Sequence, residues 1–219
     1  MAEQNETRND ASREDVMDPA ESLRILDQGA SMVRDRLQPD DRQILVAWGS
    51  SWLIGYILLW LTSDADGTIS FWAFAVFMAL LISAALFTAI HLGRRTAGIR
   101  GPSATSGSMY GGAWIISFIA VFVINNRLAA SDLDASITAP VSFGLPVMVV
   151  AILYMAGAAI YRSRAQFVLG AWIMGSLLLS LFVEMPTAYA VMGFAGGGAM
   201  LFTSLVLHAL RGRTTSRTA

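Results

Sequence analysis

The stretch that decides the fold reads Gly49-Ser50-Ser51-Trp52-Leu53-Ile54-Gly55. The same order of small residues, tryptophan, and leucine or isoleucine returns at 111–117 and at 170–175. Each copy opens a long apolar run, and a second apolar run follows it. An apolar run of about 18 residues is long enough to cross a hydrocarbon core about 30 Å thick. The pattern therefore predicts three two-helix membrane hairpins.

The composition of the chain excludes an ordinary soluble domain. Of its 219 residues, 55% are hydrophobic and only 14% are charged, and the mean hydropathy is +0.55. A soluble domain of this length exposes far more polar surface. Segments inside a bilayer must satisfy their backbone hydrogen bonds internally, which favours helices. We therefore expect an all-α polytopic membrane protein whose transmembrane domain covers residues 44–210.

Six apolar runs define the predicted transmembrane helices. They cover residues 44–62, 69–92, 109–126, 140–161, 165–184 and 187–210. The connection at 63–68 consists of turn-forming residues, and the stretch 98–108, rich in Gly, Ser and Thr, predicts a flexible loop. Pro146, two residues after Gly144, predicts a kink in the fourth span.

The segment before the first span divides into two parts. Residues 1–17 are polar and charged, and we expect them to be disordered because they have little apolar surface to bury. Residues 18–38 predict an amphipathic cytoplasmic helix, which Asp18 caps and Pro39 ends. Its apolar stripe consists of Leu23, Leu26, Ala30, Val33 and Leu37. Two interpretations stay open: the stripe packs against the inner membrane surface or the protein's own loops, or it associates with a partner or a second copy.

The distribution of arginine predicts the orientation of the spans. All 15 basic residues are arginine. They gather before the first span, after the second and fourth spans and in residues 211–219, whereas the opposite connections hold only Arg127 and are acidic. Basic residues stay on the cytoplasmic side of a membrane. We therefore predict cytoplasmic N- and C-termini, with 211–219 as a cytoplasmic tail. The exclusive use of arginine, together with the Ala and Gly content, suggests a bacterial coding genome and hence a bacterial inner (plasma) membrane.

Alignment of the three hairpins indicates parallel repeats, because each unit has an even number of spans. The aligned tryptophans are Trp52, Trp114 and Trp172. Twelve residues after them stand the polar residues Asp64, Asn126 and Glu184. We interpret these polar residues as groups at the outer rim of the membrane rather than as a gate or ligands.

Small residues beside tryptophan allow neighbouring helices to approach closely while the indole fills the adjacent space. Gly193 and Gly197 form a GxxxG pattern in the sixth span. We predict helix-packing roles for these two glycines and for the three aligned tryptophans. For the glycines, an alternative is a backbone that lines a cavity or a homodimer seam.

The sequence offers little material for catalysis. No ionisable residue stands near the middle of a predicted span, which disfavours proton-coupled transport. His91 and His208 end the second and sixth spans on the inner side, where we interpret them as inner-rim residues; pH sensing or metal binding is the alternative. The chain has no cysteine and none of the common catalytic or phosphate-binding motifs. We expect no catalytic residue, cofactor, bound metal or nucleic-acid partner.

Residues 18–62 carry a resemblance to a family. The segments are Asp18-Pro19-Ala20-Glu21-Ser22-Leu23, Leu37-Gln38-Pro39-Asp40 and Trp48-Gly49-Ser50-Ser51-Trp52-Leu53-Ile54-Gly55. They resemble a group of uncharacterised six-span integral membrane proteins of actinobacteria, some of them loosely labelled transporters. The resemblance implies a bacterial inner membrane and no particular substrate. The hairpin pattern is also similar in architecture to acid-resistance membrane proteins built from two-helix units.

Two hypotheses of function follow. The first is a small permease-like transporter of unspecified substrate, in which a homo-oligomer is expected. The second is a non-catalytic membrane scaffold or regulatory subunit that docks a cytoplasmic partner through residues 18–38. An intramembrane enzyme is the least favoured class. A continuous polar path between the helices favours transport, and solid packing around the tryptophans favours the scaffold.

Overall fold

The computed structural model describes residues 20–25, 41–96 and 102–215. The chain divides into two units, Met1–Pro39 and Asp40–Ala219. In the first unit, residues 20–25 are helical. The remainder of the predicted amphipathic helix 18–38, and all of the segment 1–17 predicted to be disordered, lie outside the described residues.

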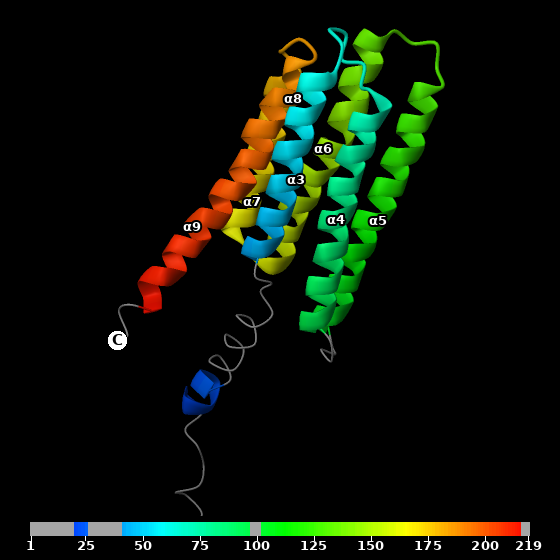
Figure 1. Ribbon diagram of the computed structural model, residues 1–219. Coiled ribbons are helices and arrows are strands. Elements are labelled where there is room, and N and C mark those ends of the chain that lie inside the picture. Colours follow the sequence, from blue (N-terminus) through cyan, green and yellow to red (C-terminus); the bar gives the residue numbers. More distant parts are fainter. Residues whose placement is uncertain (1–19, 26–40, 97–101, 216–219) are drawn as a thin grey trace, which may run out of the picture. The chain divides into compact units, whose positions relative to one another are not determined.

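The described part of the second unit is entirely helical (Figure 1). Its elements are α3 (Asp41–Thr62), α4 (Phe71–Thr96), α5 (Pro102–Ala129), α6 (Ala135–Tyr161), α7 (Arg164–Ser180), α8 (Thr187–Val191), the π-helix η1 (Met192–Gly197) and α9 (Gly198–Thr215). Five helical stretches are long and apolar enough to cross a membrane. They are Arg42–Thr62, Phe71–Arg94, Thr105–Ala129, Ser136–Tyr161 and Thr187–Ala209. For the described residues, the prediction of an all-helical architecture with several helices long and apolar enough to span a membrane is confirmed.

The predicted fifth span is shorter than expected. Helix α7 has 17 residues and ends at Ser180, not at Glu184, and at 1.5 Å per residue it is about 26 Å long. Residues 181–186 form the connection to α8. Within it, Pro186 disfavours helical backbone at the preceding residue, Met185. The sixth transmembrane crossing therefore stays a prediction.

One further prediction of local structure was wrong. The stretch 102–108, predicted as loop, is the first part of α5. Pro102 suits the first position of a helix, where its missing N–H removes no intrahelical hydrogen bond. The sixth predicted span agrees with the apolar helical stretch Thr187–Ala209, although the π-helix η1 interrupts its α-helical backbone between α8 and α9. The glycine-rich segment at this position gives the backbone the freedom to form the wider turn.

Two short connections between helices are held by local hydrogen bonds. In the turn between α3 and α4, Gly67 adopts a φ of +83°, and the backbone N–H of Thr68 donates to Asp66 Oδ1 at 3.0 Å. Between α6 and α7, Arg162 adopts left-handed backbone and its N–H bonds to the carbonyl of Ala158. Ser163 then caps α7 by accepting a hydrogen bond from the N–H of Gln166. The first of these connections agrees with the turn predicted at 63–68.

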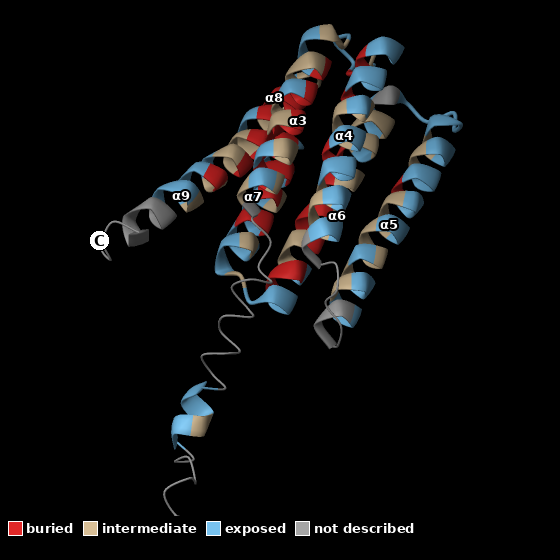
Figure 2. Cartoon of the chain, turned by 60° about the horizontal axis from the view of Figure 1, so that its bottom comes forward, coloured by how far each residue is buried: buried red, intermediate tan, exposed pale blue. Residues whose placement is uncertain are grey.

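Helix α3 occupies the centre of the packing. It contacts α4 on one side and α8, η1 and α9 on the other, while α6 contacts α5 and α7, and α7 contacts η1 (Figure 1). Burial follows this order (Figure 2): 39% of the residues are buried in the spans of α3, α6 and α8–α9, against 17% in α4 and 6% in α5. The exposed faces of α4 and α5 are apolar, as surfaces in contact with lipid are expected to be.

Candidate functional site

Helix η1 packs closely against the backbone of α3. A Cβ atom on Gly197 would lie 2.6 Å from the backbone nitrogen of Leu53 and 2.9 Å from the carbonyl oxygen of Gly49. A Cβ atom on Gly193 would lie 3.2 Å from the Cβ of Tyr56. These spaces admit glycine and nothing larger without movement of the backbone. The structure thus places the two predicted glycines in a seam between η1 and α3, which we call the glycine seam.

An aromatic cluster lies beside the glycine seam, centred on Tyr56. The Tyr56 ring is 4% exposed, and its centroid lies 4.9 Å from that of Phe77 on α4, 5.8 Å from that of Phe143 on α6 and 6.5 Å from that of Tyr189 on α8. The Trp52 ring packs edge-on against it at 5.6 Å. Four helices therefore meet at one side chain.

Sequence reasoning identified Trp52 but not the rest of this cluster. The hydroxyl of Tyr189 donates to the carbonyl of Gly67 at 3.1 Å and ties α8 to the turn after α3. The available signal was the four-residue spacing of Trp52 and Tyr56, which puts both on one helix face. The residues on the other helices carry no such signal, because their contacts depend on the order of the helices in space.

The three aligned tryptophans lie in different environments. Trp52 is 3% exposed. Trp114 on α5 is half-buried and stacks on Phe118 with a centroid distance of 6.1 Å. Trp172 on α7 is 57% exposed, although its Nε1 donates to the carbonyl of Ala195 in η1 at 2.9 Å. Equivalent positions in the sequence pattern do not share one kind of packing.

The predicted rim residues lie exposed near the connections between helices. Asp64, Asn126 and Glu184 are all exposed, and the Nδ2 of Asn126 donates to the carbonyl of Phe122 on its own helix at 2.8 Å. The neighbouring Asn125 instead links two helices, since its Nδ2 donates to the carbonyl of Ser142 on α6 at 3.1 Å. The structure does not bring the three predicted residues into one site.

Two other acids in the same connections have perturbed acidity. The hydrogen bond from the backbone N–H of Thr68 holds the pKa of Asp66 below its ordinary value. The N–H of Ser136 donates to Asp134 Oδ1 at 2.8 Å and likewise lowers the pKa of Asp134, which caps α6. Both carboxylates therefore stabilise turns in their charged form.

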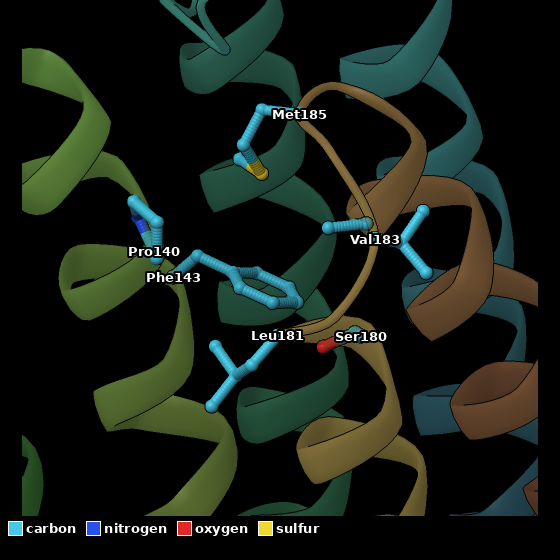
Figure 3. Close-up of a pocket in the computed structure, with 7 residues that line it drawn as sticks. Pro140, Phe143, Ser180, Leu181, Val183 and Met185 are labelled. Atoms are coloured by element: carbon cyan, nitrogen blue, oxygen red, sulfur yellow. The ribbon is translucent and has the colours of Figure 1, made fainter.

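A small cavity lies between the ends of α6, α7 and α8 (Figure 3). Its volume is about 20 Å³. Figure 3 shows the Phe143 ring reaching from α6 toward Ser180, with Met185 above it. The hydroxyl of Ser180 already donates to the carbonyl of Leu177 at 2.6 Å. This space is suited to about one water molecule and not to an organic substrate.

The two histidines have separate surroundings. The Nδ1 atom of His208 on α9 lies 3.2 Å from the Nη1 atom of Arg42 on α3. His91 on α4 stacks on Phe87 with a centroid distance of 5.5 Å. In both views α4 and α9 lie on opposite sides of α3 (Figures 1 and 2). The structure therefore does not assemble the two histidines into a shared metal site.

Within the described ranges, no group of three or more His, Cys, Asp or Glu residues is placed to hold a metal ion. What the arrangement offers instead is a closely packed helical interior. Comparison of the chain with protein-family models, with curated protein sequences and with solved structures found no match. We therefore infer function from the residues and their geometry.

Proposed function

We propose that the chain is a bacterial inner-membrane protein with six spans, arranged as three parallel hairpins with both termini in the cytoplasm. Five helices of spanning length support this. Helix α7 is the sixth candidate, and its length of about 26 Å lies within the range that local thinning of a bilayer accommodates. The arginine distribution supports the orientation. The resemblance of residues 18–62 to six-span actinobacterial proteins points to the same membrane.

Within that membrane the chain serves as a non-catalytic scaffold or regulatory subunit. The packed interior around Tyr56 is the observation that carries this proposal. Where α3, α4, α6 and α8 meet, the side chains are aromatic, and the cavity beside Phe143 measures only about 20 Å³. A path for a polar solute needs polar groups along its length, because an unpaired polar group in an apolar medium costs several kcal/mol.

The partner of this scaffold is a cytoplasmic protein that docks on residues 18–38. The support for this step is the apolar stripe in the sequence, which includes Leu26 and Val33. A stripe with this spacing has the form that helix-in-groove recognition uses. A homo-oligomer formed through the same stripe is the competing outcome.

A permease-like transporter is the second candidate, and the helix interruption at η1 favours it. Single-turn π-helices occur frequently at functional sites, and α6 contains Pro140 and Pro146 within its length. Both features would allow a helix to bend during alternating access. No substrate class follows from them.

Two experiments separate these functions. Purified chain reconstituted into proteoliposomes is expected to give no solute flux above protein-free vesicles across a panel of ions, sugars and amino acids. Flux of any panel member that requires the protein would overturn the scaffold proposal in favour of the transporter.

Crosslinking and affinity capture from membranes test docking on residues 18–38 directly. Leu26→Ser with Val33→Ser removes two apolar residues from the stripe, and Asp27→Ser with Asp35→Ser is the matched change off the stripe. We expect the first pair alone to abolish the crosslink to a cytoplasmic partner. Equal capture by both pairs would remove residues 18–38 from the proposal, and a crosslink only between copies of the chain would identify a homo-oligomer.

A further inference from the structure

An open hollow lies at the end of α4 near Arg94. Its volume is about 330 Å³, and its described lining consists of Phe87, Ile90, His91 and Arg94. These residues are spaced three, four and seven positions from the first, so they share one face of the helix. The volume falls in the range of about 300–1,000 Å³ that small-molecule sites occupy. The hollow thus combines two apolar side chains, Phe87 and Ile90, with two that carry nitrogen, His91 and Arg94.

The two polar side chains have hydrogen-bonding capacity to offer. The Nε2 atom of His91 is buried and finds no hydrogen-bond partner in the described part of the chain, while its ring is held by stacking on Phe87. Arg94 is exposed. A buried nitrogen without a partner carries a free-energy cost, which an acceptor or donor supplied by a ligand removes. The guanidinium of Arg94 donates to an oxygen-rich, negatively charged group, and the buried Nε2 of His91 reaches the same group once its ring turns toward the hollow.

We propose that this hollow binds an anionic phospholipid, with its phosphate oxygens accepting hydrogen bonds from His91 and Arg94 and an acyl chain lying along Phe87 and Ile90. A metal cation does not suit the site, because the positive charge of Arg94 repels it. A small free anion would make no use of the two apolar walls. The lipid is the ligand that uses all four side chains.

The depth of the site in a membrane agrees with this ligand. The apolar stretch Phe71–Arg94 has 24 residues and is about 36 Å long, so its ends extend beyond a hydrocarbon core of about 30 Å. Arg94 ends this stretch, at the level of the headgroups, and His91 lies about one turn before it. This step rests on the proposed function, since it requires α4 to span the membrane with Arg94 on the cytoplasmic side, where basic pockets bind anionic lipid headgroups.

Native mass spectrometry of the full chain in neutral detergent, titrated with phosphatidylglycerol, tests the site. We compare wild type, Arg94→Gln and His91→Ala with Arg164→Gln, an exposed arginine that begins α7. Loss of Arg94 is expected to raise the Kd about fivefold, the effect of one basic group at an anionic surface. His91→Ala is expected to weaken binding as well, and the control is expected to stay within twofold. Because Arg94 is exposed, its variant carries the test even if His91→Ala fails to fold.

Competitors identify the source of the phosphate. Phosphatidylcholine with the same acyl chains is expected to bind more weakly, and inorganic phosphate at millimolar concentration is expected not to displace phosphatidylglycerol. Displacement by phosphate would overturn the lipid assignment in favour of a free-anion site. Equal weakening in all three variants would overturn it in favour of diffuse charge attraction, and unchanged binding in Arg94→Gln and His91→Ala would overturn it outright.

Carbonate extraction of cell membranes separates this inference from the proposed function. Release of the wild-type chain into the soluble fraction would refute the integral membrane protein itself. Retention in the membrane without selective binding of phosphatidylglycerol would refute only the lipid site.

Discussion

Replacement of Gly197 by alanine tests whether the glycine seam holds η1 against α3. The added Cβ would lie 2.6 Å from the nitrogen and 3.0 Å from the Cα of Leu53, and 2.9 Å from the carbonyl oxygen of Gly49. All three atoms belong to backbone, so no side-chain rotation relieves the overlap. The two helices must separate, and overpacking of this kind costs about 1–3 kcal/mol.

The comparison must be made with a matched variant as well as with wild type. Alanine in place of glycine favours a helix by about 0.8–1.0 kcal/mol, which hides part of the overpacking cost. Gly198→Ala is the control, since the neighbouring position has nothing within 4 Å of an added Cβ and gains the same helix preference. The difference in unfolding free energy between the two variants is therefore expected to be about 1–3 kcal/mol, larger than the difference between Gly197→Ala and wild type.

Unfolding by sodium dodecyl sulfate in mixed micelles, followed by tryptophan fluorescence, measures this difference. Gly193→Ala supplies an intermediate case, because its Cβ would lie 3.2 Å from the Cβ of Tyr56 and 3.6 Å from the nearest backbone atoms. The expected order of stability is Gly198→Ala, then Gly193→Ala, then Gly197→Ala. Equal unfolding curves for Gly197→Ala and Gly198→Ala would refute the close approach of η1 to α3.

Three further predictions use the same unfolding assay or its thermal equivalent. Tyr56→Ala is expected to lower the free energy of unfolding by about 3–5 kcal/mol, because it removes the ring at the centre of the aromatic cluster. The control Phe182→Ala changes a side chain that is 89% exposed and should alter the free energy of unfolding by less than about 0.5 kcal/mol. Similar losses in the two variants would contradict the role of the cluster. Thr88→Val removes the acceptor of Trp48 Nε1, 3.0 Å away, and is expected to cost about 0.6 kcal/mol, an average for interhelical hydrogen bonds in membranes. The lowered pKa of Asp134 means that its charged form stabilises the fold above about pH 4, and that this contribution is lost as pH falls through the lowered pKa; melting temperatures of wild type and Asp134→Asn should therefore converge in acid, and a constant difference would contradict it.

Much of the helical content was predictable because apolar runs and turn chemistry act locally. The turn around Gly67 follows from the residues it contains. The start of α5 is hard to predict, since Ser, Thr and Gly between 102 and 108 are weak helix formers. Pro102, which suits the first helical position, is the one signal in its favour. Helix length was overestimated for α7 because apolar residues continue past Ser180 into the connection.

The candidate site was less predictable for a reason specific to membranes. Lipid tails are as apolar as a protein core, so hydrophobicity along a span does not reveal which face meets another helix. Trp52 and Trp172 have the same sequence context, yet one is 3% exposed and the other 57%. The contacts around Tyr56 depend on which helices are neighbours, and no single-chain pattern carries that information.

The spacing of glycines in the sequence carries some information about which helix face packs closely against a neighbour. Whether close packing occurs depends on the residues that the neighbouring helix presents. Gly193 and Gly197 are four residues apart and face α3, where Gly49 leaves its own backbone open. Gly107 and Gly111 have the same spacing in α5, yet a Cβ on Gly111 would meet nothing within 4 Å, and one on Gly107 would meet only the Tyr161 hydroxyl at 3.9 Å. Close approach thus depends on what the facing helix presents, which at Gly197 is the backbone of Gly49 and Leu53. The pair formed by Gly49 and Gly197, not the spacing alone, accounts for the seam on which the packing of α3 depends.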